Sequence, residues 1–283
     1  METHLASMEN ITCWAFRKLC GGVSDSYTGV MSLTNLIKRN NTWGEIDTFP
    51  IPSQRQWIQI ATSKETECAQ FFQKLDEELN KHPEKKNIYG IQLNCSCPSP
   101  NLIRIGQGPA LIKRTTKVIS LVKALLKQDK YKVGIKLRLG LNKTEVNQRK
   151  IFNLLAELEK IAKENENLVN VTIHLKHAQE SSSSEYDYSL LNELASFKLP
   201  LIINGGIKNS KDVENLLKNV SEENKKNIKG IMLGREALKN PDCFLENQRA
   251  PKEIKASFNE LCKQHQPKAI YMATIKEKCG WSV

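Results

Sequence analysis

The chain has 283 residues, of which 40% are hydrophobic and 26% are charged, values that suit a globular protein with a sizeable core. It contains no run of about 18 apolar residues, and residues 1–8 lack the basic and apolar regions of a secretory signal, so we expect a cytosolic protein without a membrane-spanning helix. The 42 Lys and Arg residues against 31 Asp and Glu residues give a net charge of +11. This charge attracts phosphate-rich partners such as RNA, although a lysine-rich, solvated surface explains it equally well.

Short apolar segments alternate with longer amphipathic ones along the chain. The short segments are rich in Val, Ile or Leu without strict alternation, a pattern typical of parallel strands buried on both faces. In chain order the predicted strands are residues 4–8, 26–30, 56–61, 89–94, 132–137, 169–174, 199–204 and 230–234. The clearest helices, with apolar residues every three or four positions, are residues 64–80, 110–126 and 151–162. Polar loops are expected over residues 95–108 and 179–188.

This alternation predicts an α/β fold, specifically a (β/α)8 TIM barrel. Repeated βα units imply right-handed crossovers, for which a closed barrel of about 250 residues is a common solution. An open doubly wound sheet would carry Gly-x-Gly-x-x-Gly after its first strand, whereas this chain has Glu9-Asn10-Ile11-Thr12 there. We divide the chain into a barrel, residues 1–245, and a short basic helical extension, residues 246–283.

Glycine-rich turns follow the last two predicted strands. The seventh strand ends in Asn204-Gly205-Gly206 and the eighth in Gly234-Arg235. Glycines let backbone amides approach a phosphate closely, and arginine adds a bidentate contact. Because barrel active sites lie at the carboxyl ends of the strands, these turns predict a phosphate site there. The alternative is that the glycines only make tight turns.

Ionisable side chains also end the fifth and sixth predicted strands. Lys136 and Arg138 are two residues apart and therefore face the same side, and His174 ends the sixth strand. A lysine in so apolar a strand is costly unless it meets an anion, an electron-rich ring or a carboxylate. A buried salt bridge is the structural alternative for Lys136, and a hydrogen-bonded core histidine is the alternative for His174.

The eight cysteines are scattered from Cys13 to Cys279, so we expect free thiols rather than a disulfide framework or a metal site. Cys97 lies in the loop after the fourth strand, next to Pro98. From the residues alone it is a buried apolar side chain or a reactive thiol with equal weight.

These segments together resemble the tRNA-dihydrouridine synthases, flavin-dependent enzymes that reduce selected uridines in tRNA. The likeness covers residues 4–245 and rests on the order and spacing of several motifs. They are Ser7-Met8-Glu9-Asn10-Ile11-Thr12, Trp57-Ile58-Gln59-Ile60, Asn94-Cys95-Ser96-Cys97-Pro98, Lys136-Leu137-Arg138, His174, Asn204-Gly205-Gly206 and Gly234-Arg235.

The resemblance implies an FMN- and NADPH-dependent oxidoreductase acting on tRNA. It implies that Cys97 is the general acid, which protonates uracil C5 while hydride from NADPH-reduced FMN reaches C6, and that Asn94 and Arg138 bind the substrate. The implied cofactor-binding residues are Ser7, Met8, Gln59, Lys136, His174, Asn204, Gly205, Gly206, Gly234 and Arg235. Basic residues after the catalytic loop are candidate phosphate contacts, or else a solvated helix face: Lys113, Arg114, Lys117, Lys123 and Lys127.

Two other functions stay open. One is a dihydroorotate dehydrogenase-like flavoenzyme acting on a free pyrimidine, whose catalytic loops also resemble residues 94–98. The other is a non-catalytic RNA-binding barrel that keeps the fold without turnover.

Overall fold

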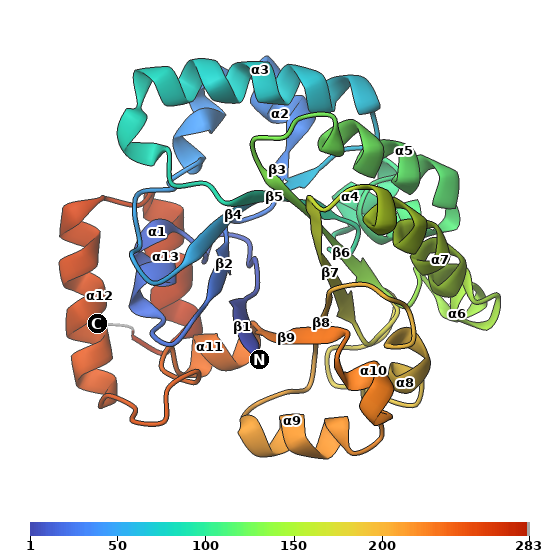
Figure 1. The fold of residues 1–283 in the computed structure, drawn as a ribbon. Helices are drawn as coiled ribbons and strands as arrows, with labels where there is room; N and C mark the ends of the chain where they lie inside the picture. The colour runs from blue at the N-terminus through green and yellow to red at the C-terminus, as the bar shows by residue number, and fades with distance from the viewer. Residues whose placement is uncertain (282–283) are drawn as a thin grey trace.

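The computed structural model describes residues 1–281, apart from the side chains of residues 40, 41 and 210. Its strands form one parallel sheet in the order β2-β1-β9-β8-β7-β6-β5-β4-β3, and a further pairing between β2 and β4 closes the sheet into a barrel (Figure 1). The strands are β1 (Glu2–Leu5), β2 (Asp25–Tyr27), β3 (Met31–Ser32), β4 (Arg55–Ala61), β5 (Gly90–Asn94), β6 (Lys132–Arg138), β7 (Leu168–His174), β8 (Leu201–Asn204) and β9 (Ile228–Leu233). The predicted TIM barrel is confirmed.

The second predicted strand, residues 26–30, is wrong over its last three residues. β2 and β3 both pair with β4, so they are two pieces of one barrel position separated by residues 28–30. In the gap the Thr28 hydroxyl accepts the N–H of Gln59 at 3.1 Å, in place of a backbone carbonyl. A side chain therefore interrupts the ladder here without leaving the neighbouring amide unsatisfied.

The first predicted strand, residues 4–8, also ends early, at Leu5. The carbonyl of Met8 accepts the N–H groups of Ile11 and Thr12, both at 3.2 Å. Asn10, which lies between Met8 and Ile11, has a φ of +55°. The chain thus turns sharply beyond the strand and carries residues 6–8 onto the barrel mouth. The other predicted strands overlap the observed ones with small differences at their ends.

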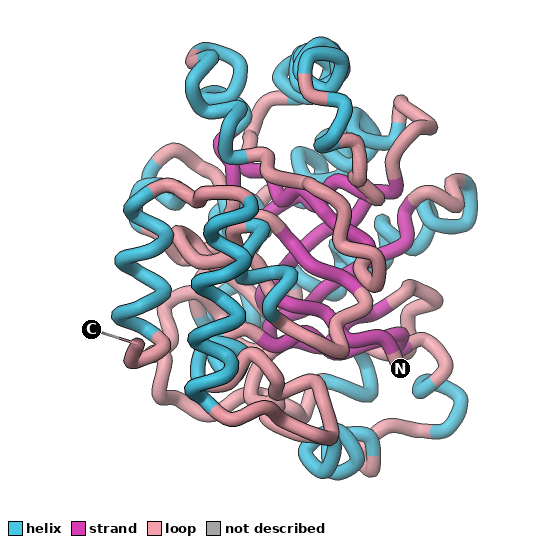
Figure 2. The backbone as a smooth tube through the Cα atoms, turned by 90° about the vertical axis from the view of Figure 1, so that its left-hand side faces the viewer, coloured by secondary structure: helices cyan, strands magenta, loops and turns pink. Residues whose placement is uncertain are grey.

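Helices surround the barrel (Figure 2), and the apolar stripes of the longer ones pack against it. The predicted stripes are confirmed in α3 (Glu65–Lys81) and α7 (Lys150–Glu164), whose buried faces join the main core. Apart from the helices over residues 108–126, the other helices between the first strand and the extension are α1 (Trp14–Leu19), α2 (Leu33–Lys38), η1 (Asn40–Glu45), η2 (Pro83–Lys85), α4 (Pro100–Arg104), α6 (Lys143–Asn147), α8 (Leu191–Leu194), α9 (Ser210–Leu217), α10 (Glu222–Lys225) and α11 (Arg235–Lys239).

The predicted helix over residues 110–126 is two helices. A 3-10 helix, η3 (Gly108–Lys113), is followed by α5 (Thr115–Leu126), and Arg114 between them has non-helical backbone with φ −120° and ψ 70°. Thr115 and Thr116 thereby occupy the first turn of α5. Threonines are better accommodated there than in a helix interior, because their branched side chains restrict the helical backbone. The predicted polar loop over residues 95–108 also contains the short helix α4.

The carboxyl-terminal extension forms α12 (Pro251–Gln264) and α13 (Ala269–Lys278), which lie beside α1 on the outside of the barrel (Figures 1 and 2). Phe258 of α12 and Ile275 of α13 are fully buried in one apolar cluster with Phe16 of α1. Residues 282–283 of the predicted extension lie outside the described residues, and the boundary at residue 245 stays a prediction. Among the described helices, none is both long and apolar enough to cross a membrane.

Candidate active site

The predicted site residues meet in one cavity of about 450 Å³ at the carboxyl ends of the strands. This volume lies within the range of small-molecule and cofactor sites. Every residue predicted above for catalysis, cofactor binding or substrate binding lines the cavity: Ser7, Met8, Gln59, Asn94, Cys97, Lys136, Arg138, His174, Asn204, Gly205, Gly206, Gly234 and Arg235. The fold therefore brings the predicted residues together, while their individual roles remain predictions.

Lys136 presents a buried ammonium group to this cavity. The residue is 9% exposed, and no hydrogen bond or ion pair of its Nζ occurs among the described residues. Burial, with the nearby Arg138 adding in the same direction, lowers the pKa of Lys136 to about 8. The alternative of a buried salt bridge is thus not found in the described part of the chain. A desolvated cation without a partner is suited to an anionic or electron-rich ligand.

His174 is held as a neutral, oriented imidazole. Its Nδ1 lies 2.8 Å from Oδ1 of Asn204, whose amide nitrogen in turn donates to the carbonyl of Met232 at 2.7 Å. The Asn204 oxygen can only accept, so Nδ1 carries the hydrogen and Nε2 keeps its lone pair. Burial, with Arg138 and Lys136 nearby, lowers the pKa of His174 to about 3. The ring is therefore uncharged at neutral pH.

Of the two cysteines in the loop after β5, only Cys97 lines the cavity. Cys95 is fully buried, whereas Cys97 is half-buried. Asn94 accepts the N–H groups of Ser96 and Cys97 at 3.1 and 2.9 Å, and Arg138 donates to the Ser96 carbonyl at 2.7 Å. The loop thus has a fixed shape. Burial raises the pKa of the Cys97 thiol, and the nearby Glu9 acts in the same direction, so the thiol keeps its proton at neutral pH.

The glycine turns form the other end of the cavity. Gly205 and Gly206 have φ values of +115° and +74°, a region that strongly favours glycine. Among the described residues, the backbone N–H groups of Gly205, Gly206 and Gly234 donate no hydrogen bond. Free amides at adjoining turns are the donors that an anion requires. Turns that only reverse the chain would not need to leave them open.

The serine-rich loop covers this end of the cavity, which the sequence did not predict. Arg235 donates to the hydroxyl of Tyr186 and, at 3.1 Å, to the carbonyl of Ser182. Lys176, 2% exposed, donates to carbonyls of Ser181 and Ser182 at 3.1 and 3.4 Å, and its Nζ lies 4.3 Å from the centre of the Tyr186 ring. The sequence signal for this cover is a pair of tyrosines, Tyr186 and Tyr188, in the polar loop that follows β7.

Comparison with known proteins places the chain in a family. The model of the family described as "Dihydrouridine synthase (Dus)" matches residues 4–280. The chain belongs to the dihydrouridine synthase family. The match extends through α12 and α13, so the helical extension is part of what the chain shares with the family.

Curated members of the family are similar at modest identity. The chain is 31% identical over 140 residues to the tRNA-dihydrouridine(47) synthase [NAD(P)(+)] of Debaryomyces hansenii, covering 49% of this chain and 20% of that protein. It is 26% identical over 195 residues to a probable tRNA-dihydrouridine synthase of Helicobacter pylori, covering 66% of this chain and 51% of that protein. The alignments thus span between a fifth and about half of these relatives.

Among solved structures, morphinone reductase superposes with a TM-score of 0.51 at 10% identity, covering 91% of this chain and 88% of that one. This likeness concerns the barrel fold alone.

Proposed function

We propose that the chain is a tRNA-dihydrouridine synthase, which reduces the C5–C6 double bond of uridine in tRNA. The observation that carries the proposal is that two groups line the same cavity. One is the protonated, half-buried thiol of Cys97, and the other is the buried ammonium group of Lys136, which has no partner among the described residues. Membership of the family and the names of its curated members support the same reaction.

The cavity suits FMN by the chemistry of its donors. Lys136, Gln59 and the neutral His174 offer polar contacts to a flavin ring, and the free amides near Gly205 with the Arg235 guanidinium suit its phosphate. FMN, when bound and reduced by NADPH, would supply the hydride for uracil C6. Lys136 would stabilise negative charge that develops on the ring, since a preoriented cation acts strongly in a site shielded from water.

The protein's own residues then supply the proton and the orientation of the base. Cys97 donates its thiol proton to uracil C5 as the general acid, and its raised pKa keeps that proton available. Asn94 and Arg138 hold the loop that carries Cys97 and line the cavity themselves. Their remaining donor capacity would contact the uracil and its nucleotide.

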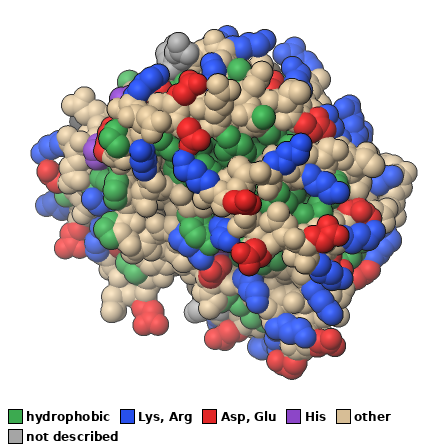
Figure 3. All heavy atoms as spheres, turned by 45° about the horizontal axis from the view of Figure 1, so that its top comes forward, with side chains coloured by type: hydrophobic (Ala, Val, Ile, Leu, Met, Phe, Trp, Pro, Cys, Tyr) green, Lys and Arg blue, Asp and Glu red, His purple; other side chains and the backbone are tan. Residues whose placement is uncertain are grey.

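A tRNA substrate must also be bound outside the cavity, because extracting a base from folded RNA costs a few kcal/mol. Lysine and arginine side chains outnumber acidic ones on the face shown in Figure 3, although the two kinds are interspersed. Lys113 pairs with Glu145 at 3.5 Å and Lys117 pairs with Glu65 at 2.5 Å. Of the five basic residues over 113–127 that were candidates for phosphate contacts, Arg114, Lys123 and Lys127 are therefore the better ones.

The test is the dihydrouridine content of tRNA that lacks the modification, after incubation with purified protein, FMN and NADPH. We expect a gain that requires protein and NADPH and that is lost in Cys97→Ala. The matched control is Cys243→Ala, since Cys243 is also half-buried but lies outside the cavity. Absence of any gain from a flavin-loaded protein would overturn the proposal, and turnover of free pyrimidines by the same sample would favour the dihydroorotate dehydrogenase-like alternative.

A further inference from the structure

A chain of buried side-chain hydrogen bonds begins at the loop that carries Cys97 and enters the barrel. The Cys97 N–H donates to Oδ1 of Asn94 at 2.9 Å, and the amide nitrogen of Asn94 donates to Oε1 of Gln59 at 2.6 Å. Gln59 then donates to Oε1 of Gln92 at 2.6 Å. Asn94, Gln59 and Gln92 are 3%, 1% and 0% exposed. The interior of the barrel is therefore hydrogen-bonded and polar below the cavity.

The same series of hydrogen bonds continues to the opposite end of the barrel. Gln92 donates to Oδ1 of Asn170 and to Oγ1 of Thr172, both at 3.3 Å, and Asn170 donates to the Tyr27 hydroxyl at 2.6 Å. That hydroxyl lies 3.0 Å from Nδ1 of His4. Burial raises the pKa of Tyr27 well above its ordinary value, so the hydroxyl keeps its hydrogen. Because the hydroxyl oxygen accepts from Asn170, its own hydrogen is available to Nδ1 of His4. We call the series from Asn94 to His4 the relay.

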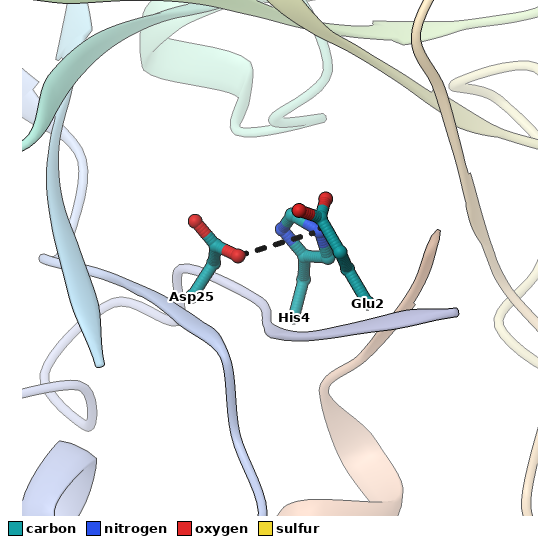
Figure 4. Close-up of side chains that lie close together, drawn as sticks. All are labelled: Glu2, His4 and Asp25. Carbon is teal, nitrogen blue, oxygen red and sulfur yellow. Dashed lines mark ion pairs between the residues drawn. The ribbon is translucent and has the colours of Figure 1, made fainter. Parts of the chain in front are cut away.

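The relay ends at carboxylates near the amino ends of the strands (Figure 4). Nε2 of His4 lies 3.4 Å from a carboxylate oxygen of Glu2 and 3.7 Å from one of Asp25, and it makes no hydrogen bond among the described residues. These three residues place ligand atoms within 4.8 Å of one another, as a metal site would. Arg55, however, pairs with both carboxylates at 2.5 and 2.6 Å and already supplies the positive charge. We therefore interpret Glu2, Asp25 and Arg55 as a group of ion pairs at the end of the relay, rather than as a metal site.

All hydrogen bonds of the relay run in one direction. Each amide accepts on the side of the Cys97 loop and donates toward His4. The end at the Cys97 loop enforces this direction, because the backbone N–H groups of Ser96 and Cys97 can only donate and so require the oxygen of Asn94. Turning one amide over would bring two donors or two acceptors face to face in the buried interior of the barrel. A buried unsatisfied group of this kind is strongly unfavourable, so the amides keep their orientations together.

We propose that Gln92, Asn170 and Tyr27, which do not line the cavity, are positioning residues that hold Asn94 and hence the Cys97 loop in its reactive shape. The inference concerns how Cys97 is placed, and its catalytic significance rests on the proposed function. A break anywhere in the relay frees Asn94 to turn, and the N–H groups of Ser96 and Cys97 then lose their acceptor. The loop opens more often and the thiol becomes more accessible.

The test measures the rate at which iodoacetamide alkylates Cys97, followed by peptide mass spectrometry, in the full chain without tRNA or NADPH. In Gln92→Met, which keeps the side-chain volume, we expect the Cys97 rate to rise about fivefold, the factor that one lost hydrogen bond gives. Cys243 and Cys279 in the same sample serve as internal references and should keep their rates. Gln54→Met is the matched control, since Gln54 is a buried amide with two hydrogen bonds outside the relay.

A second variant tests whether the residues act together through the relay or each affect the structure independently. Tyr27→Phe removes one oxygen at the far end, and we expect it also to speed the alkylation of Cys97. In the double variant with Gln92→Met the rate should equal that of Gln92→Met alone, because a relay already cut loses nothing further. Unchanged Cys97 rates in the single variants, or fully additive effects in the double variant, would overturn the proposal.

If Gln92→Met does not fold, Tyr27→Phe carries the test by itself, and an unchanged Cys97 rate in that variant overturns the inference. The measurement is independent of turnover, so a wild-type protein inactive on tRNA would contradict the proposed function and leave the relay to be judged by alkylation. With an active protein, kcat should fall in Gln92→Met while the KM for tRNA stays the same, because the relay lies beneath the site and does not touch RNA.

Discussion

The ring of Tyr186 packs directly against Gly205, so closely that a Cβ atom at position 205 would overlap the tyrosine ring. The tyrosine comes from the loop after β7 and the glycine from the turn after β8. Tyr186 therefore packs against the glycine turn whose free amides we assign to a phosphate, and its hydroxyl accepts a hydrogen bond from Arg235. We therefore expect cofactor loading to require movement of this ring.

Tyr186→Ala is expected to speed FMN association. An aromatic contact contributes ~1 kcal/mol, so its loss should raise the association rate about fivefold. Stopped-flow quenching of flavin fluorescence measures the rate. Tyr186→Phe keeps the ring and loses only the bond to Arg235, so its rate should fall between those of wild type and Tyr186→Ala. Equal rates in all three proteins would mean that the ring does not obstruct the site.

Gly205→Ala is expected to lower both stability and flavin occupancy. The φ of +115° is unfavourable for alanine, and the new methyl group would displace Tyr186, for a combined loss of about 1–3 kcal/mol in the free energy of unfolding. Urea denaturation and the flavin absorbance of the purified protein report the two effects. Gly44→Ala is the control, because a Cβ there meets no atom within 4 Å. A stable, flavin-loaded Gly205→Ala protein would contradict the assigned phosphate site.

Lys136→Met is expected to stabilise the flavin-free protein and abolish FMN binding. The pKa of Lys136 falls from 10.5 to about 8 on folding, which corresponds to about 3 kcal/mol of destabilisation at pH 7. Between pH 8 and 10.5 the unfolded chain binds the additional proton, so the wild-type stability attributable to Lys136 rises with pH across this window. That rise should vanish in Lys136→Met and persist in Lys132→Met, a half-buried lysine of the same strand. Identical pH profiles for wild type and Lys136→Met would refute the prediction.

Cys97→Ser is expected to lower the rate of uridine reduction by about 10²–10⁴, because serine is a far weaker acid than a thiol. In the wild type, kcat should stay constant from neutral pH upward and fall only above the ordinary pKa of a thiol, since burial raises that of Cys97. Single-turnover rates with flavin-loaded enzyme over a pH series separate this step from tRNA binding. A decline centred below the ordinary thiol pKa would indicate that another group supplies the proton.

Phe258→Ala tests whether the extension stabilises the barrel. Phe258 is fully buried against α1, so truncation should lower the free energy of unfolding by about 3–5 kcal/mol in one cooperative transition. The control is Ile270→Ala on the neighbouring helix, where the side chain is 53% exposed. Two separate transitions would instead favour an extension that folds independently of residues 1–245.

The barrel and its cavity could be predicted because the signals are local. Parallel strands buried on both faces are continuous apolar runs, and the residues that end them must meet at one edge of the barrel. Cys97, Lys136, His174 and the Gly205 turn were located in this way, each from its own few neighbours in the chain. Where a side chain replaced backbone pairing, as Thr28 does, the strand prediction was wrong.

The sequence by itself determined the fold class, the family and the set of residues around the cavity, since these depend on periodicity and on spacing along the chain. Only the tertiary structure decided that Tyr186 covers Gly205 and that the buried amides point in one direction. Those features depend on contacts between distant segments, such as the bond between Asn170 and Tyr27, which are 143 residues apart. A hydrogen bond is set by the distance and direction between two groups in space, and no local pattern in a sequence records either quantity.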